Sequence, residues 1–370
     1  MNIFLAITNK IIFMKQYLDL LQNIIDNGVE KESGRANMPN TIGISHGVIK
    51  MNLADGFPLL TTKKMAWKTI IHELLWFLRG ETNIKYLVDN NVHIWDGDAY
   101  RWYQKHFDKP GMKTYTMDEF IEKIKEGNLT VYTKDIDWND PVVLSSTWVG
   151  YQLGDLGKVY GYQWRNQNGV DQVKNVIDGL KDNPYSRYHI INAWNAADFK
   201  KMALPPCHLL YQFIVRPLTL DRRHNIYRER NNGMMINFDS IETIKKILDE
   251  CEIPKFYLDL NMYQRSCDTI LGVPFNIASM SLLLMIVAQV SNMIPGISTW
   301  IGGDTHLYVD HVEKAKEQIQ REPLPLPELK INKELKTLDD ILSLTIQDFE
   351  LIGYESHEKI IAELHTGYKK

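Results

Sequence analysis

Residues 275–292 read FNIASMSLLLMIVAQVSN, and this long apolar run restricts the fold more than any other feature of the chain. A helix that is hydrophobic on every side is stable only when other elements surround it, so the run predicts a buried helix. Helical periodicity predicts further helices at 16–27, 66–79, 82–90 and 171–182. Thr82 is the expected N-cap of the third of these. Strands are expected at 189–195, 207–215 and 256–263. Because helices and strands are mixed without strict alternation, we expect an α+β fold.

The composition limits the classes of partner. The chain has 370 residues, 44% hydrophobic and 24% charged, as is usual for a globular protein of one large or two ordinary domains. Its net charge of −4 argues against gripping a polynucleotide or an anionic membrane by bulk charge. A few well-placed arginines would suffice for a small nucleotide. We therefore expect no membrane partner and no specific nucleic-acid partner.

The N-terminus and the cysteines indicate the compartment. The stretch MNIFLAITNKIIF is interrupted by polar residues at 8–10 and lacks a small-residue cleavage site, so we expect neither a membrane span nor a signal peptide. Met14 is an alternative start, because every recognisable segment follows it. The 3 cysteines show no repeated spacing, which indicates a reducing compartment without a disulfide framework. A reducing compartment indicates a cytoplasmic protein. No Cys and His residues stand at zinc-binding spacing, so we also expect no metal.

Two stretches look like insertions into the predicted core. Residues 98–152 are rich in aromatic and charged residues with weak periodicity, and residues 217–255 contain the polar run LDRRHNIYRERNNG. Surface decoration is the favoured interpretation of both. The basic run around 222–230 could instead contact a partner or a nucleic acid, but the acidic residues elsewhere in the chain weaken that alternative.

Chemistry-bearing residues gather in two segments. In LPPCHLLYQF, at 204–213, Cys207 follows two prolines at the start of an apolar strand and is therefore held rigidly, although such a cysteine taken alone is more often a buried hydrophobe. In YQRSCDTILGVPFNIAS, at 263–279, several polar groups precede the apolar helix. Arg265 suits a phosphate because its planar fork gives paired hydrogen bonds. The Asn276 amide can donate and accept at once, as the edge of a pyrimidine requires.

These segments do not stand alone. Six more share their character: DGFPLLTTKK (55–64), HELLWFL (72–78), GDLGKVYGYQWR (154–165), GGDTHLY (302–308), REPLPLPEL (321–329) and FELIGY (349–354). Together they resemble the signature segments of the thymidylate synthase family, from about Met14 to Tyr354, and eight segments in one chain are far more specific than a lone motif. The resemblance implies a mixed β-sheet covered by helices. It also implies a single catalytic domain at 14–370 that carries both insertions, after an N-terminal extension at 1–13.

The resemblance also implies a role for each matching residue. Cys207 resembles the nucleophile that adds to C6 of dUMP, and Arg265 resembles an arginine that bonds the phosphate and favours the thiolate. The residues that resemble the proton-moving network around C5 and O4 are Glu73, Tyr160 and His208. Those that resemble the other ligands of dUMP are Ser266 (phosphate), Asn276 (uracil), Asp268 (base, through its backbone), and His306 and Tyr308 (deoxyribose). Arg187 resembles an arginine donated to the phosphate across a homodimer. On the folate side stand Trp95, Lys63, Gly272 and the Asp268 side chain.

The implied reaction uses 5,10-methylenetetrahydrofolate as co-substrate. Addition of the Cys207 thiolate to C6 makes C5 nucleophilic, and C5 then attacks the methylene carbon of the folate. A base in the network of Glu73 and Tyr160 removes the C5 proton. Loss of tetrahydrofolate leaves an exocyclic methylene on C5, and hydride from the folate reduces it when water is excluded.

Three elements that close the site in the family differ here. The arginine loop reads GRANMPNTIGISHG (34–47), with Arg35 as the best match, and Asp98 stands where a second lid tryptophan is usual. The tail after Tyr354 reads ESHEKIIAELHTGYKK, longer and more charged than the usual apolar end. In addition, Tyr188 replaces a second arginine after Arg187.

We therefore expect water to take the place of hydride. The Asp98 carboxylate could orient or deprotonate this water, and the alternative is a solvated acid at the mouth of an insertion. The products would be 5-hydroxymethyl-dUMP and tetrahydrofolate, as in the dUMP hydroxymethylases that bacteriophages use to make modified DNA. The alternative is thymidylate synthase activity, which gives dTMP and dihydrofolate. A non-catalytic nucleotide- or RNA-binding homologue is disfavoured, because such a module needs no nucleophile like Cys207. The amide at Asn276 favours uracil over cytosine.

Overall fold

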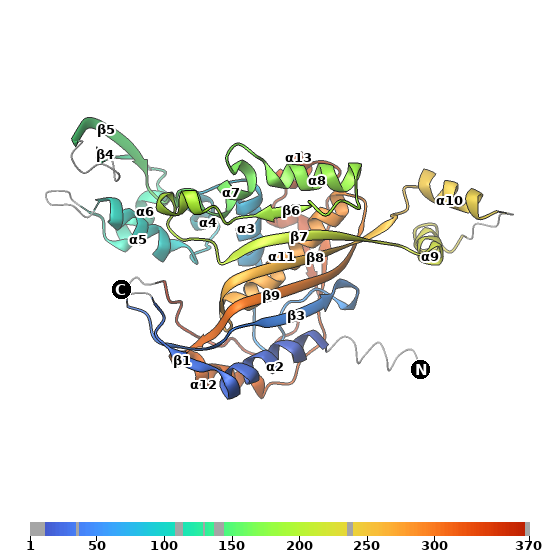
Figure 1. The fold of residues 1–370 in the computed structure, drawn as a ribbon, viewed down its shortest axis with the longest axis horizontal. Coiled ribbons are helices and arrows are strands. Elements are labelled where there is room, and N and C mark those ends of the chain that lie inside the picture. The colour runs from blue at the N-terminus through green and yellow to red at the C-terminus, as the bar shows by residue number, and fades with distance from the viewer. Residues whose placement is uncertain are drawn as a thin grey trace.

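The computed structural model describes residues 12–34, 37–107, 114–128, 130–136, 144–234 and 240–366. Within these ranges a central sheet of seven strands runs through the molecule (Figure 1). Its strands, in spatial order, are β1 (Val29–Lys31), β2 (Thr41–Ile44), β9 (Ile294–Tyr308), β8 (Phe256–Asp268), β7 (His208–Pro217) and β6 (Ile190–Asn192), and β3 (Gly47–Asn52) also pairs with β9. β8 and β9 are parallel, whereas the other pairs are antiparallel. The mixed sheet confirms the α+β expectation.

Helices α11 (Gly272–Val290) and α3 (Trp67–Leu78) pack on one face of this sheet (Figure 1). α11 is long and apolar enough to cross a membrane by length and composition, but most of it lies inside the fold. This is the environment that a helix apolar on every side requires, and it confirms the buried helix predicted at 275–292. The other helices around the sheet are α2 (Ile12–Asn27), α7 (Tyr160–Asn166), α8 (Gln172–Asp182), α12 (Val312–Ile319) and α13 (Leu338–Leu342).

The four other predicted helices are present, but one cap prediction is wrong. Thr82 does not cap α4 (Lys85–Asp89), because that helix begins later and the Thr82 hydroxyl donates instead to the Asp155 carboxylate at 2.7 Å. The Asn83 side chain accepts from the Lys85 N–H at 2.9 Å and takes over the start of the helix. Strands β7 and β8 extend beyond the predicted ranges, β6 is shorter, and β9 was not predicted.

The stretch at 98–152 is not only surface decoration. It holds the greater part of α5 (Asp96–Phe107), together with α6 (Met117–Lys125) and the hairpin of β4 (Thr130–Ile136) and β5 (Leu144–Gln152). Tyr100 and Tyr103 of α5 and Phe120 of α6 are buried in the main core. In contrast, α9 (Leu220–Arg230) and α10 (Ile241–Glu250) form a small hydrophobic cluster of their own, away from that core.

The C-terminal third completes the molecule with a small second sheet of β10 (Glu328–Ile331) and β11 (Phe349–Ile352). Short 3₁₀ helices connect the larger elements: η1 (Leu53–Asp55), η2 (Ala196–Lys201), η3 (Val309–His311) and η4 (Ile346–Asp348). η2 and η3 matter for the site, because η2 leads into the segment before Cys207 and η3 directly follows Tyr308.

Candidate active site

Cys207, the predicted nucleophile, lies at the entry to β7 and is half-buried. Its backbone N–H donates to the Tyr160 hydroxyl at 2.6 Å, and its carbonyl accepts from the Arg265 N–H at 2.8 Å. The two prolines before it present carbonyls to the Arg265 guanidinium, at 2.8 Å from Pro205 and 2.7 Å from Pro206. The segment is therefore held between α7 and β8, which is the rigid placement that the sequence predicts.

The Arg265 guanidinium also lies beside the sulfur. Its Nη2 is 3.9 Å from the Cys207 Sγ, and a positive charge at this distance favours the thiolate, which is the nucleophilic form. Nη1 makes no hydrogen bond to a described residue and is left for an anion. The other two cysteines are less suited to attack a substrate. Burial raises the pKa of Cys267 to about 12, and Cys251 lies exposed at the end of α10.

A buried proton network lies next to Cys207. Burial raises the pKa of Glu73 to about 7, although the Trp95 Nε1–H that donates to its carboxylate at 2.8 Å acts in the opposite direction. Burial lowers the pKa of His208 to about 3, so its ring is neutral, and the ring bonds the Tyr211 hydroxyl at 2.6 Å. Tyr160 stacks on His208 with ring centroids 4.4 Å apart, and burial raises its pKa, which keeps the phenol protonated. A carboxyl that titrates near neutrality can both take and return a proton.

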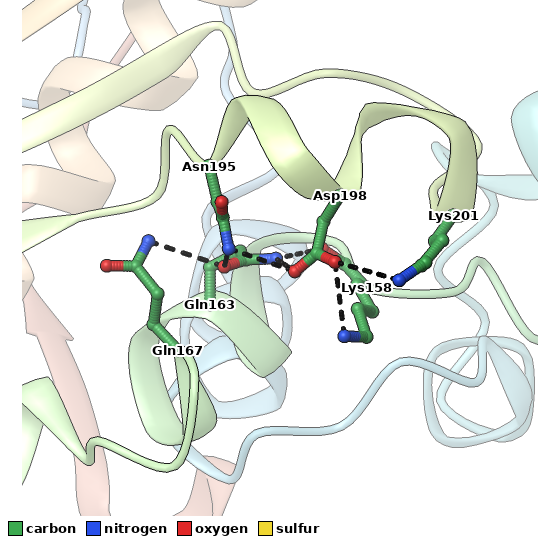
Figure 2. A network of polar contacts seen from close by, with 6 residues as sticks. All are labelled: Lys158, Gln163, Gln167, Asn195, Asp198 and Lys201. Atoms are coloured by element: carbon green, nitrogen blue, oxygen red, sulfur yellow. Dashed lines mark hydrogen bonds and ion pairs between the residues drawn. The ribbon is translucent and has the colours of Figure 1, made fainter.

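A second polar network anchors the segment that leads to Cys207 (Figure 2). The buried Asp198 carboxylate of η2 accepts from Asn195 at 2.9 Å and from Gln163 of α7 at 3.2 Å. Lys158 forms an ion pair with it at 3.1 Å. These bonds satisfy a buried charge and tie η2, which precedes Cys207, to the helix that carries Tyr160.

The predicted nucleotide ligands meet at the ends of β8 and β9. The parallel register places Asp268 opposite His306 and Ser266 opposite Asp304. The Asp268 Oδ1 accepts from the backbone N–H groups of Ile270 and Leu271 at 3.1 and 3.2 Å, which turns the chain into α11.

The His306 ring lies 3.3 Å from the Asp304 carboxylate, and it lowers the pKa of Asp304 to about 2. Tyr308 meets the His306 ring edge to face, with centroids 5.6 Å apart. Asn276, on the first turns of α11, is half-buried, and its amide makes no hydrogen bond to a described residue. An unpaired amide in this position fits the donor and acceptor edge of a pyrimidine.

Three of the predicted folate residues also come together. The buried Lys63 ammonium donates to the Ile270 carbonyl; burial lowers its pKa to about 8, and the nearby Asp268 carboxylate acts in the opposite direction. A Cβ added at Gly272 would lie 3.7 Å from the Asp268 Cβ and 3.9 Å from the Asn276 amide nitrogen. The folate and nucleotide predictions therefore converge on one turn, between β8 and α11.

A sequence profile described as thymidylate synthase matches residues 15–366. The chain belongs to the thymidylate synthase family. It is 42% identical over 349 residues to a thymidylate synthase of Malacoplasma penetrans, across 94% of this chain and 98% of the relative. Thymidylate synthases of Mycoplasma mobile and Mesoplasma florum are 41% and 39% identical, each across 95% of this chain and 99% of its own length.

Membership makes the chain a one-carbon transferase of the thymidylate synthase type and confirms the expected enzyme class and fold. The family binds dUMP and folate and uses 5,10-methylenetetrahydrofolate as co-substrate. The matched region spans both stretches that were predicted as insertions. The names of the relatives favour the synthase alternative over the expected hydroxymethylase.

Three of the predicted site residues do not join this group. Arg35 lies outside the described residues. Arg187 is exposed just before β6 and has no partner among the described residues. Asp98 is buried on the first turn of α5, where its carboxylate forms an ion pair with Arg101. Because this carboxylate is already engaged by a guanidinium, the contact gives no support to its predicted role in orienting water.

The tail after Tyr354, which the family uses to close its site, is packed against the body of the protein. The Tyr354 hydroxyl donates to the Leu60 carbonyl at 2.8 Å, and the His357 N–H donates to the Thr61 carbonyl at 2.8 Å. Arg321 donates to the Glu358 carbonyl at 2.7 Å, and Ile360 is buried. The first half of the tail is therefore held both by hydrogen bonds of its backbone and by the burial of the Ile360 side chain.

The second half of the tail reaches α5. Arg101, the partner of Asp98, also donates to the Thr366 carbonyl. A Cβ added at Gly97 would lie 2.5 Å from the Thr366 hydroxyl oxygen, so the glycine makes this close approach feasible. Sequence reasoning missed Arg101, Gly97 and Thr366, and also Tyr211, the partner of His208. Tyr211 stands in PPCHLLYQF, Thr366 in the quoted tail and Arg101 in the predicted insertion at 98–152, but no local pattern marked these residues individually.

Proposed function

We propose that this chain catalyses the reductive methylation of dUMP to dTMP, with 5,10-methylenetetrahydrofolate supplying both the carbon and the hydride and leaving as dihydrofolate. The relatives named thymidylate synthase support this reading. The observation that carries it is the packed tail, because reduction of the exocyclic methylene requires that water be kept out. The hydroxymethylase expectation depended on a lid weakened at three places, whereas the tail has anchors of its own on α5.

The chain's own groups suit the early steps. The Arg265 guanidinium, 3.9 Å from the sulfur, favours the Cys207 thiolate that attacks C6. The Asn276 amide reads the uracil edge and stabilises negative charge as it develops at O4. Glu73, whose pKa is raised to about 7, accepts a proton at neutral pH and serves the removal of the C5 proton.

Hydroxymethylation of dUMP remains the second candidate, and Asp98 is the residue that favours it. A carboxylate replaces apolar surface at the position of the second lid tryptophan, one helical turn from Trp95. A buried polar group can hold a water molecule near the folate. Its ion pair with Arg101, which ties α5 to the tail, gives the same residue a part in closure instead.

A product assay separates the two reactions. The protein is incubated with dUMP and 5,10-methylenetetrahydrofolate, and both nucleotides and both folates are quantified. dTMP and dihydrofolate in equal amounts are the expected outcome, whereas 5-hydroxymethyl-dUMP with tetrahydrofolate would overturn the proposal. Arg101→Ala should loosen the tail and raise the hydroxymethyl share of the product. Lys105→Ala, an exposed change on the same helix, is the matched control and should leave the ratio unchanged.

We also propose that the enzyme is a homodimer that pairs through the open face of its sheet. Ile214 of β7 and Tyr263 of β8 are 39% and 40% exposed, and Trp194 beside β6 is 37% exposed. Exposed apolar side chains grouped on a sheet typically mark an interface. Arg187, exposed and without a described partner, would then reach the phosphate in the second subunit. A monomer by sedimentation that is fully active would contradict this arrangement.

A further inference from the structure

A cluster of three side chains joins the C-terminal tail to the end of β9. Asp310 and His311 belong to η3, and His365 belongs to the tail. One potential ligand atom from each lies within 4.8 Å of the others. The His365 Nε2 is 2.9 Å from the Asp310 carboxylate, and the rings of His311 and His365 are stacked with centroids 5.0 Å apart.

His311 is the unexplained member of this cluster. Its side chain is 2% exposed, and neither ring nitrogen makes a hydrogen bond to a described residue. The Glu363 backbone lies near the ring but makes no hydrogen bond of good geometry to either nitrogen. Leaving a buried polar group unpaired is unfavourable, and a native site of this kind calls for a partner, such as an ion.

We propose that Asp310, His311 and His365 bind a divalent transition-metal ion, with Zn²⁺ as the best fit, and that the ion pins the tail to the body of the enzyme. Two imidazoles and one carboxylate are a typical zinc ligand set, with a fourth position left to water. Ligand atoms about 2.0–2.2 Å from a tetrahedral ion lie roughly 3.4 Å apart. The atoms here lie within 4.8 Å of one another, so side-chain rotations that bring them closer by up to about 1.4 Å would close the site.

This ligand set escapes the sequence rules for zinc. Asp310 and His365 are 55 positions apart, far outside the short spacings that mark a metal motif. The tail brings them together only when it is packed as it is here. The ion would therefore bind only when the tail is packed against the body of the enzyme. It would lie next to Tyr308, whose ring meets that of His365 edge to face with centroids 4.6 Å apart.

Metal titration tests the binding itself, independently of the reaction proposed above. The full chain carrying Cys207→Ser and Cys251→Ser is used, so that no accessible thiol competes, and Zn²⁺ is titrated against a chromogenic chelator. We expect one ion per chain. His365→Ala, added to this background, should weaken binding by at least about tenfold, since even outer-shell changes at metal sites cost about 10–100-fold. The matched control is His357→Ala, because His357 lies in the same tail but bonds the Glu322 carbonyl at 2.7 Å.

Asp310→Asn provides a second variant that keeps the shape of the side chain and removes its charge. It should also weaken Zn²⁺ binding, with an unchanged far-ultraviolet circular dichroism spectrum as the test of folding. Co²⁺ in place of Zn²⁺ should give the intense visible bands of a tetrahedral nitrogen and oxygen site. Absence of stoichiometric binding, or equal affinity of the His365→Ala and His357→Ala proteins, would overturn the proposal.

Proteolysis tests the pinning of the tail. Lys359 is exposed in the tail and offers trypsin a site between its two halves. Saturating Zn²⁺ should slow cleavage there in the background protein and in its His357→Ala variant, but not in its His365→Ala variant. Cleavage rates that are insensitive to Zn²⁺ in all three proteins would show that the ion does not hold the tail.

Discussion

Glu73→Gln should make the protein more stable at alkaline pH while it removes the proposed proton acceptor. Burial raises the pKa of this carboxyl from 4.5 to about 7 in the folded chain. The unfolded chain therefore loses the proton first as pH rises, and the folded chain bears the cost of a buried charge. Stability linked to Glu73 is fully present below pH 4.5 and is progressively lost as pH rises to about 7.

The size of the effect follows from the two pKa values. For a group that titrates at 4.5 unfolded and about 7 folded, the linked stability falls by about 2.5 kcal/mol between about pH 5 and pH 8. Glutamine has the same shape, can still accept from the Trp95 N–H through its amide oxygen, and does not titrate. The difference in unfolding free energy between Glu73→Gln and the parent should therefore grow by about 2.5 kcal/mol over that range. The low pKa of His208 contributes equally to both proteins and cancels.

Urea unfolding followed by tryptophan fluorescence, at equal protein concentration and several pH values, measures this difference. Glu350→Gln serves as the control, because Glu350 is exposed on β11 and should show no such growth. Turnover of Glu73→Gln should fall at least about a hundredfold, the usual contribution of a positioned general base. A stability difference that does not change with pH would refute the buried-charge argument, and unchanged turnover would refute the catalytic one.

Three further changes test other parts of the site. Cys207→Ser should abolish turnover and retain dUMP binding, because an alcohol replaces the thiolate, and near-normal activity would rule out the proposed nucleophile. Mixing inactive Cys207→Ser and Arg187→Ala subunits should restore part of the activity in heterodimers; no recovery in a verified mixed dimer would show that Arg187 does not act across the interface. Asn276→Asp should shift the ratio of kcat/KM from dUMP towards dCMP, since the hydrogen-bond polarity of the site is reversed, and a constant ratio would show that Asn276 does not read the base.

Local sequence patterns were enough to predict the elements whose hydrophobic and capping residues lie within one short stretch of the chain. The helix that became α11 is apolar throughout, and α8 has a clear periodicity after its N-cap Asp171, so both were predicted near their observed ends. β9 was missed because its stability comes from pairing with β2, β3 and β8, which lie elsewhere in the chain. Thr82 was wrongly assigned as a cap because its partner, Asp155, lies 73 positions away.

The sequence by itself determined the family. It also identified candidate site residues such as Cys207, Arg265 and Asn276, because the segments that carry them are continuous and specific. Only the tertiary structure decided how these groups behave. The raised pKa of Glu73 and the lowered pKa of His208 follow from burial, which no local window reports. The anchoring of the tail on Arg101 joins residues 265 positions apart. Contacts between residues so far apart in the sequence form only when the chain folds. They explain why the tail, which was expected to leave the site open, is packed against the body of the protein.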